Sequence, residues 1–183
     1  MKKISIACVL VCFSLTYAIA QNCKYKTNEI DKFTNKFTKQ TKSEKVISSF
    51  YTEGEFSVKK SDTSYSFIFD YKISSYSNFE PYSIKQGALL MFLLENGEMV
   101  TLKSSDNING IKKTVVLLPP VYECYLTNIS YPVSKSQIDL LFKSKIKSIR
   151  FYRTESNGKE DFIDNEIKKK NQEEIQNLIK CVL

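Results

Sequence analysis

The chain has 183 residues, with 27 Lys and Arg against 20 Asp and Glu, a formal net charge of +7, and no histidine. The absence of histidine excludes Ser-His-Asp and Cys-His nucleophile systems and every His-ligated metal site. The five glycines stand singly, which excludes a glycine-rich phosphate loop, and only two basic residues are arginines, which argues against a nucleic-acid partner.

Residues 1–20 have the three parts of a cleavable secretory signal peptide. Lys2 and Lys3 give a positive start, an apolar run extends from Ile4 to Leu15, and Ala18 and Ala20 place small residues before the expected cleavage point. The apolar run is shorter than the roughly 20 residues that cross a bilayer, so we expect no membrane span after processing. The mature protein is predicted to be bacterial and exported, either periplasmic or secreted.

The mature chain, residues 21–183, has the size of one ordinary domain. Without Lys2 and Lys3 it carries 25 basic and 20 acidic residues, a balance of +5. Cys12 follows valine and Cys23 follows asparagine, whereas a lipoprotein signal needs a small residue before the cysteine, so a lipid anchor is disfavoured.

Three cysteines survive processing: Cys23, Cys124 and Cys181. In an oxidising compartment two of them are expected to form a disulfide and one to remain free. The sequence does not choose among the three pairings. A zinc site would need more cysteine or some histidine, so no metal and no cofactor is predicted.

Alternating apolar side chains predict several strands in the first half of the mature chain. Residues 30–41 predict a short hairpin with its turn at Asn35-Lys36, and residues 46–51 and 55–59 predict two strands joined by a turn at Gly54. The clearest strand is 64–73, because five large side chains fall on one face, which must be buried. They are Tyr65, Phe67, Phe69, Tyr71 and Ile73.

Two Asn-Gly pairs predict tight hairpins in the second half. The turn at 95–98 joins strands at 88–94 and 99–102, and the turn at 155–158 joins strands at 146–154 and 159–163. Strands at 114–118 and 122–131 flank Pro119-Pro120, which marks a break or a sheet edge because proline cannot donate a ladder hydrogen bond.

Two helices are predicted late in the chain. Ser134 and Gln137 form a capping box at the start of the first, whose buried stripe is Ile138, Leu141 and Phe142. The second is predicted to begin at Asp164 or Asn165 and to run nearly to the C-terminus, because its apolar residues recur at helical spacing.

Together these elements predict an α+β fold. We expect a mainly antiparallel sheet of about eight or more strands, with two helices late in the chain, the last one C-terminal. Residues 21–183 are expected to form this single α+β domain.

Paired carboxylates are the catalytic chemistry that the composition leaves open. Glu29 with Asp31, or Glu160 with Asp161 and Asp164, are the candidates for hydrolysis of a glycosidic bond. The alternative is that they are solvated charges at turns and strand ends, with Asp164 a helix cap. Since none has a diagnostic spacing, no catalytic, cofactor-binding or metal-binding residue is assigned.

Two further features have both a functional and a structural interpretation. Cys124 as a nucleophile would need a nearby lysine or helix terminus to lower its pKa, whereas a disulfide half or a core residue needs neither. Tyr76, Phe79 and Tyr82 lie in a polar segment and form either a stacking platform for a sugar or peptide, or a cover over the open edge of the core.

Several segments resemble a family of small exported proteins from Bacteroidota-type bacteria. They are Asn28-Glu29-Ile30-Asp31-Lys32-Phe33-Thr34, residues 93–102 (LLENGEMVTL), Tyr131-Pro132-Val133-Ser134, Ile149-Arg150-Phe151-Tyr152 and the Lys/Glu/Gln-rich last helix. The resemblance implies export and a compact α+β domain, and it supplies no catalytic residues. The cysteines depart from the family pattern.

These observations lead to two functional hypotheses. The first is a non-catalytic envelope or secreted domain that binds a protein or glycan ligand. The second is a carboxylate-dependent hydrolase that acts on a cell-surface polymer. Two carboxyl groups facing each other across a deep cleft would favour the hydrolase, and a shallow surface with an aromatic patch or an open sheet edge would favour the binding domain.

Overall fold

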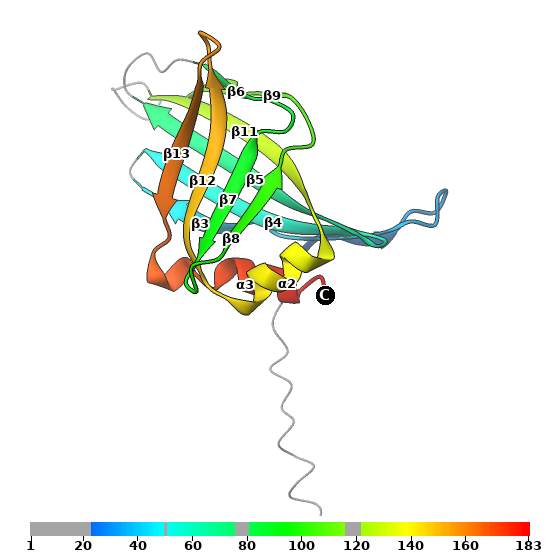
Figure 1. Ribbon diagram of the computed structural model, residues 1–183. Helices are drawn as coiled ribbons and strands as arrows, with labels where there is room; N and C mark the ends of the chain where they lie inside the picture. Colours follow the sequence, from blue (N-terminus) through cyan, green and yellow to red (C-terminus); the bar gives the residue numbers. More distant parts are fainter. Residues whose placement is uncertain (1–22, 50, 76–80, 116–121) are drawn as a thin grey trace, which may run out of the picture.

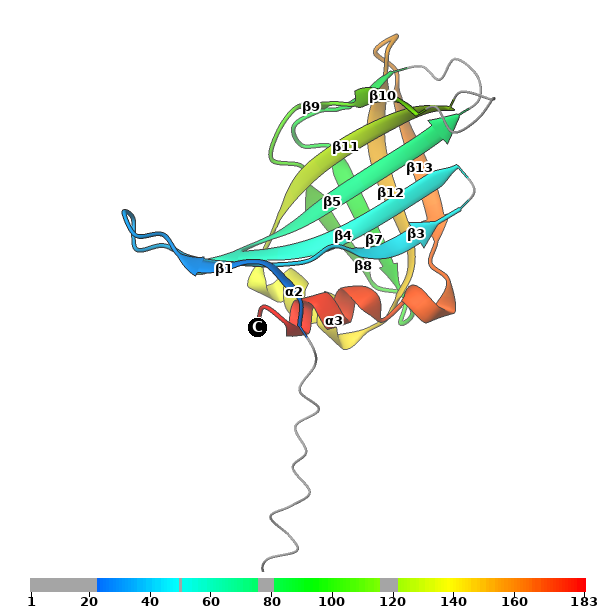
Figure 2. The same cartoon turned by 180° about the vertical axis from the view of Figure 1, so that it is seen from behind.

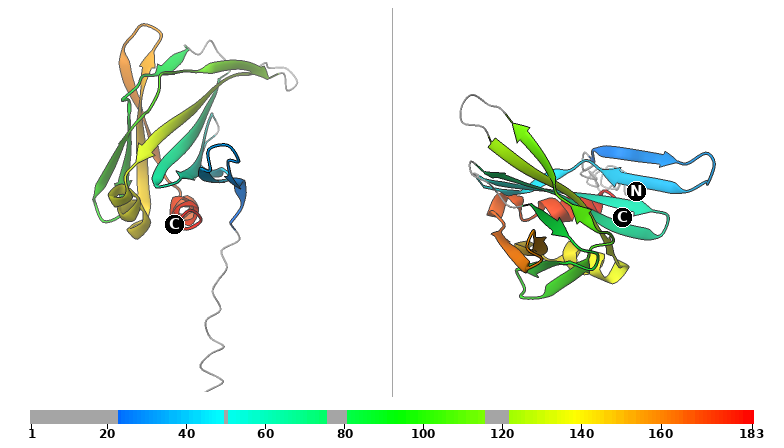
Figure 3. Two further views of the ribbon diagram at one scale, coloured as in Figure 1. Left: turned by 90° about the vertical axis from the view of Figure 1, so that its right-hand side faces the viewer. Right: turned by 90° about the horizontal axis from the view of Figure 1, so that it is seen from above.

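The computed structural model describes residues 23–49, 51–75, 81–115 and 122–183. In these ranges two antiparallel sheets face each other, and two α-helices lie together at one end of the sheets (Figure 1 and Figure 3). The mainly antiparallel α+β class is therefore confirmed, although its strands divide between two sheets in a sandwich-like arrangement. The signal segment, Tyr76, Phe79 and Pro119-Pro120 lie outside the described residues.

Sheet A has seven strands in the order β1-β2-β4-β5-β11-β10, and β3 pairs with the same strand, β4, that pairs with β2. Their bounds are β1 Tyr25–Ile30, β2 Phe37–Thr41, β3 Glu44–Ser48, β4 Thr52–Ser61, β5 Ser64–Ser75, β10 Ile111–Val115 and β11 Tyr122–Val133. The central strands β5 and β11 have 12 residues each and pair from Tyr65 opposite Val133 to Ser75 opposite Glu123. Figure 2 shows this sheet from its outer side.

Sheet B has six strands in the order β8-β7-β12-β6-β9, and β13 covers the other edge of β12. Their bounds are β6 Tyr82–Ile84, β7 Leu89–Leu94, β8 Met99–Lys103, β9 Ile108–Asn109, β12 Ile146–Glu155 and β13 Glu160–Glu166. Both predicted Asn-Gly hairpins are present, and the glycines of their turns, Gly97 and Gly158, have φ angles of +85° and +84°. Only glycine adopts this conformation without strain.

The chain passes from sheet B to sheet A at Gly110. Strand β9 pairs with β6 in sheet B, and β10, which begins one residue after Gly110, pairs with β11 in sheet A. The N–H of Gly110 donates to the carbonyl of Tyr82 at 3.1 Å, and a Cβ at Gly110 would lie 3.1 Å from that same oxygen. Close approach of two backbones at this corner therefore favours glycine.

The two helices close one end of the space between the sheets (Figure 1). Helix α2, Lys135–Lys143, begins after Ser134 with the predicted capping box, and Gln137 also donates to the carbonyl of Thr101 in β8 at 2.8 Å. Helix α3, Glu174–Lys180, follows the 3-10 turn η1, Lys169–Asn171. Gln176 donates to the carbonyl of Phe142 at 2.9 Å, which ties α3 to the end of α2.

The predicted start of the last helix was wrong, because α3 begins only at Glu174. Asp164 and Asn165 belong to β13, where they pair with Arg150 and Ile149 of β12. Cross-strand pairing therefore prevails over the helical spacing of the apolar residues in this part of the chain. The apolar residues assigned to that helix are nevertheless buried: Ile167, Ile175, Leu178, Ile179 and Val182.

The core lies between the sheets and is rich in aromatic rings. The predicted inward face of β5 is confirmed for Phe67, Phe69, Tyr71 and Ile73, which are buried, while Tyr65 at the start of the strand is partly buried against the core. Phe69 stacks on Phe56 of β4 with ring centroids 4.4 Å apart, and Phe151 of sheet B meets the ring of Tyr71 edge-on at 4.5 Å. These contacts join the two sheets directly.

Gly54 does not form the turn that the sequence predicts. It lies inside β4, opposite Tyr71 of β5 and Ile47 of β3, and a Cβ there would lie 2.9 Å from the Cδ1 of Ile47 and 3.0 Å from the Phe69 ring. The glycine is therefore a packing residue, because its missing side chain leaves room for two buried neighbours.

One disulfide joins the first residue of the described chain, Cys23, to a residue near its end, Cys181. Cys23 precedes β1 and Cys181 follows α3, and their Cα atoms are 5.6 Å apart. The hydroxyl of Tyr25 donates to the carbonyl of Cys181 at 3.0 Å beside it. The expected single bridge is thus present, and Cys124 is the free, buried cysteine.

We predict that Phe67→Ala lowers the free energy of unfolding by about 3–5 kcal/mol, because it empties a fully buried site between Phe56 and Phe92. Urea denaturation measures this change. Ile111→Ala, at an exposed site on β10, is the control and should change the same quantity by less than about 0.5 kcal/mol. A loss below about 1 kcal/mol for Phe67→Ala would show that the core is assigned incorrectly.

We also predict that the denatured, unreduced mature protein contains one reactive thiol and that reduction exposes three. The bridge closes a loop with a sequence separation of 158, so its reduction should lower the free energy of unfolding by about 2–4 kcal/mol. Thiol titration and denaturation with and without reductant measure both effects. Cys124→Ser should remove the single thiol without affecting the bridge, and three thiols before reduction would contradict the assignment.

Candidate functional site

The first predicted carboxylate pair lies on the hairpin formed by β1 and β2. Glu29 is exposed, and Asp31 accepts hydrogen bonds from the N–H groups of Thr34 and Phe33 at 2.7 and 2.9 Å. Both bonds lower the pKa of Asp31, and the bond from Thr34 has the larger effect. Asp31 is therefore an ionised cap of a turn, and it does not act as a proton donor near neutral pH.

The second predicted group lies along β13 and is divided between its two faces. Asp161 is bound by Arg153 at 2.9 Å, and Asp164 is bound by both Nε and Nη2 of Arg150 at 2.6 Å each. The arginine hydrogen bonds lower the pKa of both carboxyl groups. Since residues of opposite parity in a strand point to opposite faces, these two carboxylates do not face each other. The proposed helix cap at Asp164 is wrong, because its carboxylate binds Arg150.

Cys124 and Tyr82 are both core residues. Cys124 is buried in β11, with its sulfur 3.3 Å from the hydroxyl of Ser74. Tyr82 is also buried, its hydroxyl lies 3.3 Å from that of Thr127, and the guanidinium of Arg153 lies 5.5 Å from the centre of its ring. For Tyr82, the structure therefore bears out a core position rather than an exposed stacking platform.

Three buried polar atoms in the interior have no hydrogen-bond partner among the described residues: the hydroxyls of Tyr71 and Tyr131 and the Nδ2 of Asn165. Burial raises the pKa of Tyr71 to about 12, and it also raises the pKa of Tyr131. Both hydroxyls stay protonated near neutral pH. The Tyr71 ring packs against Phe69 and Phe151 in this interior.

The outer face of sheet B has a different character, because β7 is apolar on both sides. Leu90, Phe92 and Leu94 are buried in the core, while the alternate residues Leu89, Met91 and Leu93 are only partly covered. A strand with one solvated face normally alternates apolar and polar residues. The described part of the chain covers this second apolar side only partly (Figure 1).

Neighbouring strands extend this apolar surface through their register. Met99 of β8 lies opposite Leu93, Arg150 of β12 lies opposite Met91, and Phe162 of β13 lies opposite Tyr152. Directly opposite residues share a face of an antiparallel sheet. We call the resulting surface the apolar outer face, and it consists of Leu89, Met91, Leu93, Met99, Arg150, Tyr152 and Phe162.

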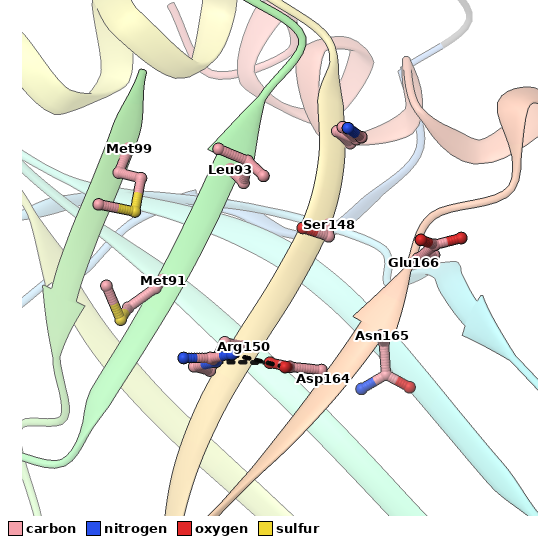
Figure 4. Close-up of a pocket in the computed structure, with 9 residues that line it drawn as sticks. Met91, Leu93, Met99, Ser148, Arg150, Asp164, Asn165 and Glu166 are labelled. Atoms are coloured by element: carbon pink, nitrogen blue, oxygen red, sulfur yellow. Dashed lines mark hydrogen bonds and ion pairs between the residues drawn. The ribbon is translucent and has the colours of Figure 1, made fainter. Parts of the chain in front are cut away.

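A hollow of about 420 Å³ lies on the apolar outer face (Figure 4). Met91, Leu93 and Met99 line one side, and Asp164 and Glu166 line the other. The guanidinium of Arg150 lies between them, 4.2 Å from the centre of the Phe162 ring and held by Asp164. The Asp164 hydrogen bonds raise the pKa of Arg150, so its charge is permanent. A second hollow, of about 320 Å³, lies further along β12 beside Leu89 and Tyr152.

Sheet A has a hollow of about 320 Å³ on its outer side. It contains Glu53, Glu55 and Asp70 together with apolar parts of Ile111 and Leu126. Glu53 binds Lys45 at 2.8 Å and Lys72 at 3.4 Å, and the hydrogen bond from Lys45 is the main cause of its lowered pKa. Asp70 accepts a hydrogen bond from Asn128.

The sequence prediction did not identify Met91, Met99, Arg150 or Phe162 as members of one surface. The signal that could have found them is the run Leu89–Leu94, which is apolar at every position. Such a run in an otherwise alternating antiparallel protein indicates a strand that is covered on both faces.

The described residues contain no cluster of three or more Cys, Asp or Glu side chains that could hold a metal ion. Among the helices in those ranges, none combines the length and apolar character needed to cross a bilayer.

The buried hydroxyl of Tyr71 leads to a prediction for the variant Tyr71→Phe. Removing an unpartnered buried hydroxyl should raise the free energy of unfolding by about 1 kcal/mol near neutral pH. The pKa of Tyr71 is about 12 in the folded protein and 10.0 in the unfolded chain, so above pH 10 the unfolded chain loses this proton first. The free energy of unfolding is therefore unaffected by Tyr71 below pH 10 and falls as the pH rises toward 12. Tyr71→Phe should therefore reduce this alkaline loss, as measured by urea denaturation across that range. Tyr152→Phe, on the outer face, is the control, and a clear destabilisation by Tyr71→Phe would show that the hydroxyl has a partner in solution.

No protein-family model, no curated protein and no solved structure matches this chain. Its own geometry is therefore the basis for any statement about what it does.

Proposed function

We propose that this protein is a non-catalytic exported domain that binds a protein ligand through the apolar outer face of sheet B. The observation that carries the proposal is the double-sided apolar character of β7, whose outward residues Leu89, Met91 and Leu93 are only partly covered by the described chain. Burial of apolar surface is the main favourable contribution to most protein association. A ligand would complete the packing that sheet B begins.

The composition of the apolar outer face favours a protein over a glycan. Methionine, tyrosine, phenylalanine and arginine are the residue types enriched in the centres of protein interfaces. A glycan would need several free hydrogen-bonding groups, whereas Arg150 and Asp164 already bind each other through two bonds of 2.6 Å. The two methionines add unbranched side chains that adapt to an apolar partner surface.

The position of Arg150 favours recognition without large rearrangement. Its guanidinium is held by Asp164 and lies over Phe162, so a long side chain that is usually mobile is restrained before a ligand arrives. Restraint of this kind lowers the entropy cost of association. We further propose that the ligand lies outside the cytoplasm, in line with the predicted signal peptide and with the resemblance to small exported proteins of Bacteroidota-type bacteria.

The hydrolase alternative is considered at the hollow on sheet A, where three carboxyl groups come together. Glu55 and Asp70 are register partners there and share a face. However, Asp70 is bonded to Asn128, and Glu53 is paired with two lysines. Since no observation marks one of these carboxyl groups as a proton donor, we do not extend the proposal to catalysis.

The proposal is tested with a photo-reactive amino acid at Met99, in the mature protein exported by living cells. We expect a cross-linked protein adduct of one defined mass, and Phe162→Ser should reduce its yield about tenfold. The matched control is the same photo-reactive amino acid at Ile111 on sheet A, because the two side chains are 63% and 62% exposed. Equal adducts at both positions, or no adduct at Met99, would contradict the proposal. An adduct with twice the mass of the chain would instead identify a second copy as the partner.

A further inference from the structure

The β1–β2 hairpin projects from the body of the protein (Figure 1 and Figure 2). Strand β1 pairs with β2 alone, and β2 pairs with β4 only from Thr38 to Gln40. The disulfide of Cys23 anchors the base of the hairpin to the end of α3. The distal part of the hairpin therefore extends into solvent from a firmly held base.

Two apolar side chains are exposed at the far end of this hairpin. Phe33 is 98% exposed and Ile30 is 61% exposed, and Phe33 has the highest exposure among the large hydrophobic residues of the described chain. Burial of these two side chains against an apolar phase would be favourable, by about 1.5–3 kcal/mol for a fully buried phenylalanine.

The turn that carries Phe33 is fixed by hydrogen bonds. The carboxylate of Asp31 accepts from the N–H groups of Phe33 and Thr34, and the Asp31 carbonyl accepts from the N–H of Asn35 at 2.8 Å. Asn35 takes the left-handed conformation with φ of 55°, which asparagine tolerates. The structure therefore holds Phe33 at the apex instead of letting it fold back onto the body.

The hairpin also carries most of the net charge of the mature protein. Residues 24–42 contain six lysines and two acidic residues, a balance of +4, while the whole mature chain has a balance of +5. The lysines are Lys24, Lys26, Lys32, Lys36, Lys39 and Lys42. The excess of lysine lies along and below the two strands, whereas the turn region, residues 29–36, carries two lysines, Lys32 and Lys36, and two acidic residues.

We propose that the tip of the β1–β2 hairpin binds an anionic phospholipid membrane surface. Phe33 and Ile30 enter the interfacial region, and the lysines behind them lie near the phosphate groups. Peripheral binding of this type combines a small buried apolar area with attraction of lysines to anionic lipids. A protein partner is disfavoured because a stable protein interface buries about 800 Å² on each side, far more than two side chains at an apex can supply.

This proposal is independent of the protein ligand of sheet B. The hairpin extends sheet A and the apolar outer face belongs to sheet B, so the two surfaces have no residue in common. Membrane contact through the hairpin would place the domain at a bilayer surface while its outer face stays available.

The absence of tryptophan from the chain allows a direct test. Phe33→Trp introduces a single fluorophore at the apex, and Met99→Trp introduces one at the apolar outer face as the matched control. With vesicles of equal parts phosphatidylcholine and phosphatidylglycerol, we expect a blue shift and quenching by brominated acyl chains for Phe33→Trp alone. Vesicles of phosphatidylcholine alone should give no shift.

Flotation of the full mature protein with the same vesicles measures the contribution of each group. Phe33→Ser should weaken partitioning about tenfold because the apolar contact is lost. Lys32→Gln combined with Lys36→Gln should weaken it about twentyfold, and added salt should act in the same direction. The matched charge control is Lys113→Gln with Lys159→Gln, two exposed lysines of the body, which should change partitioning much less.

All these substitutions are at exposed positions, and unchanged circular dichroism and an intact disulfide would establish that the variants are folded. Failure of the wild-type protein to float with anionic vesicles would overturn the proposal. Equal partitioning of Phe33→Ser, or equal binding to neutral vesicles, would overturn it too. Phe162→Ser should float normally, so failure here is distinguishable from failure of the sheet B proposal.

Discussion

The aromatic contacts between the two sheets are the constraint on which the rest of the structure depends. Phe56 and Phe69 stack within sheet A, and Phe151 of sheet B packs edge-on against Phe69 and Tyr71. Rings of this size bury large apolar areas and accept few relative orientations, so they fix both the spacing and the facing of the sheets. Gly54 permits this packing, because any side chain there would collide with Ile47 and Phe69. The two helices then close the end of the space that the rings define.

The core itself is dominated by apolar and aromatic side chains, and burial keeps Tyr71 protonated far above neutral pH. Asp164 on the outer face of sheet B and Asp161 on the opposite face of the same sheet are each matched to an arginine, which lowers their pKa and makes them structural anions. Surface pairing of this kind orients side chains more than it stabilises the fold. It therefore supports recognition surfaces better than it supports acid–base catalysis.

The disulfide connects the core to the periphery. It joins Cys23, two residues before β1, to Cys181, the residue after α3, and thereby fixes the base of the hairpin. Strand β1 is an edge strand that pairs only with β2 in the described chain, and such strands fray easily, so the bridge restrains its beginning. The bridge thus gives a basic, apolar-tipped projection a defined direction relative to sheet B.

Local patterns determined much of this architecture. The Asn-Gly turns at 95–98 and 155–158, the inward face of β5, the capping box at Ser134 and the antiparallel α+β class all follow from residues that are neighbours in the chain, because turn chemistry, strand alternation and helix capping act over a few residues. The errors arise where pairing with a distant strand competes with a local preference for another structure. The apolar residues that follow Asp164 and Asn165 recur at helical spacing, but pairing with Arg150 and Ile149 of β12 holds these two residues in a strand.

The tertiary structure alone decided the division of the strands into two sheets, the choice of Cys181 as the partner of Cys23, and the assembly of the apolar outer face. These depend on contacts between residues far apart in the chain, such as Met91 opposite Arg150, and a sequence pattern of period two cannot choose among distant partners. The same reason applies to the exposure of Phe33. Its neighbours in the sequence predict a hairpin turn, and only the position of that turn beyond the edge of sheet A leaves the ring in solvent.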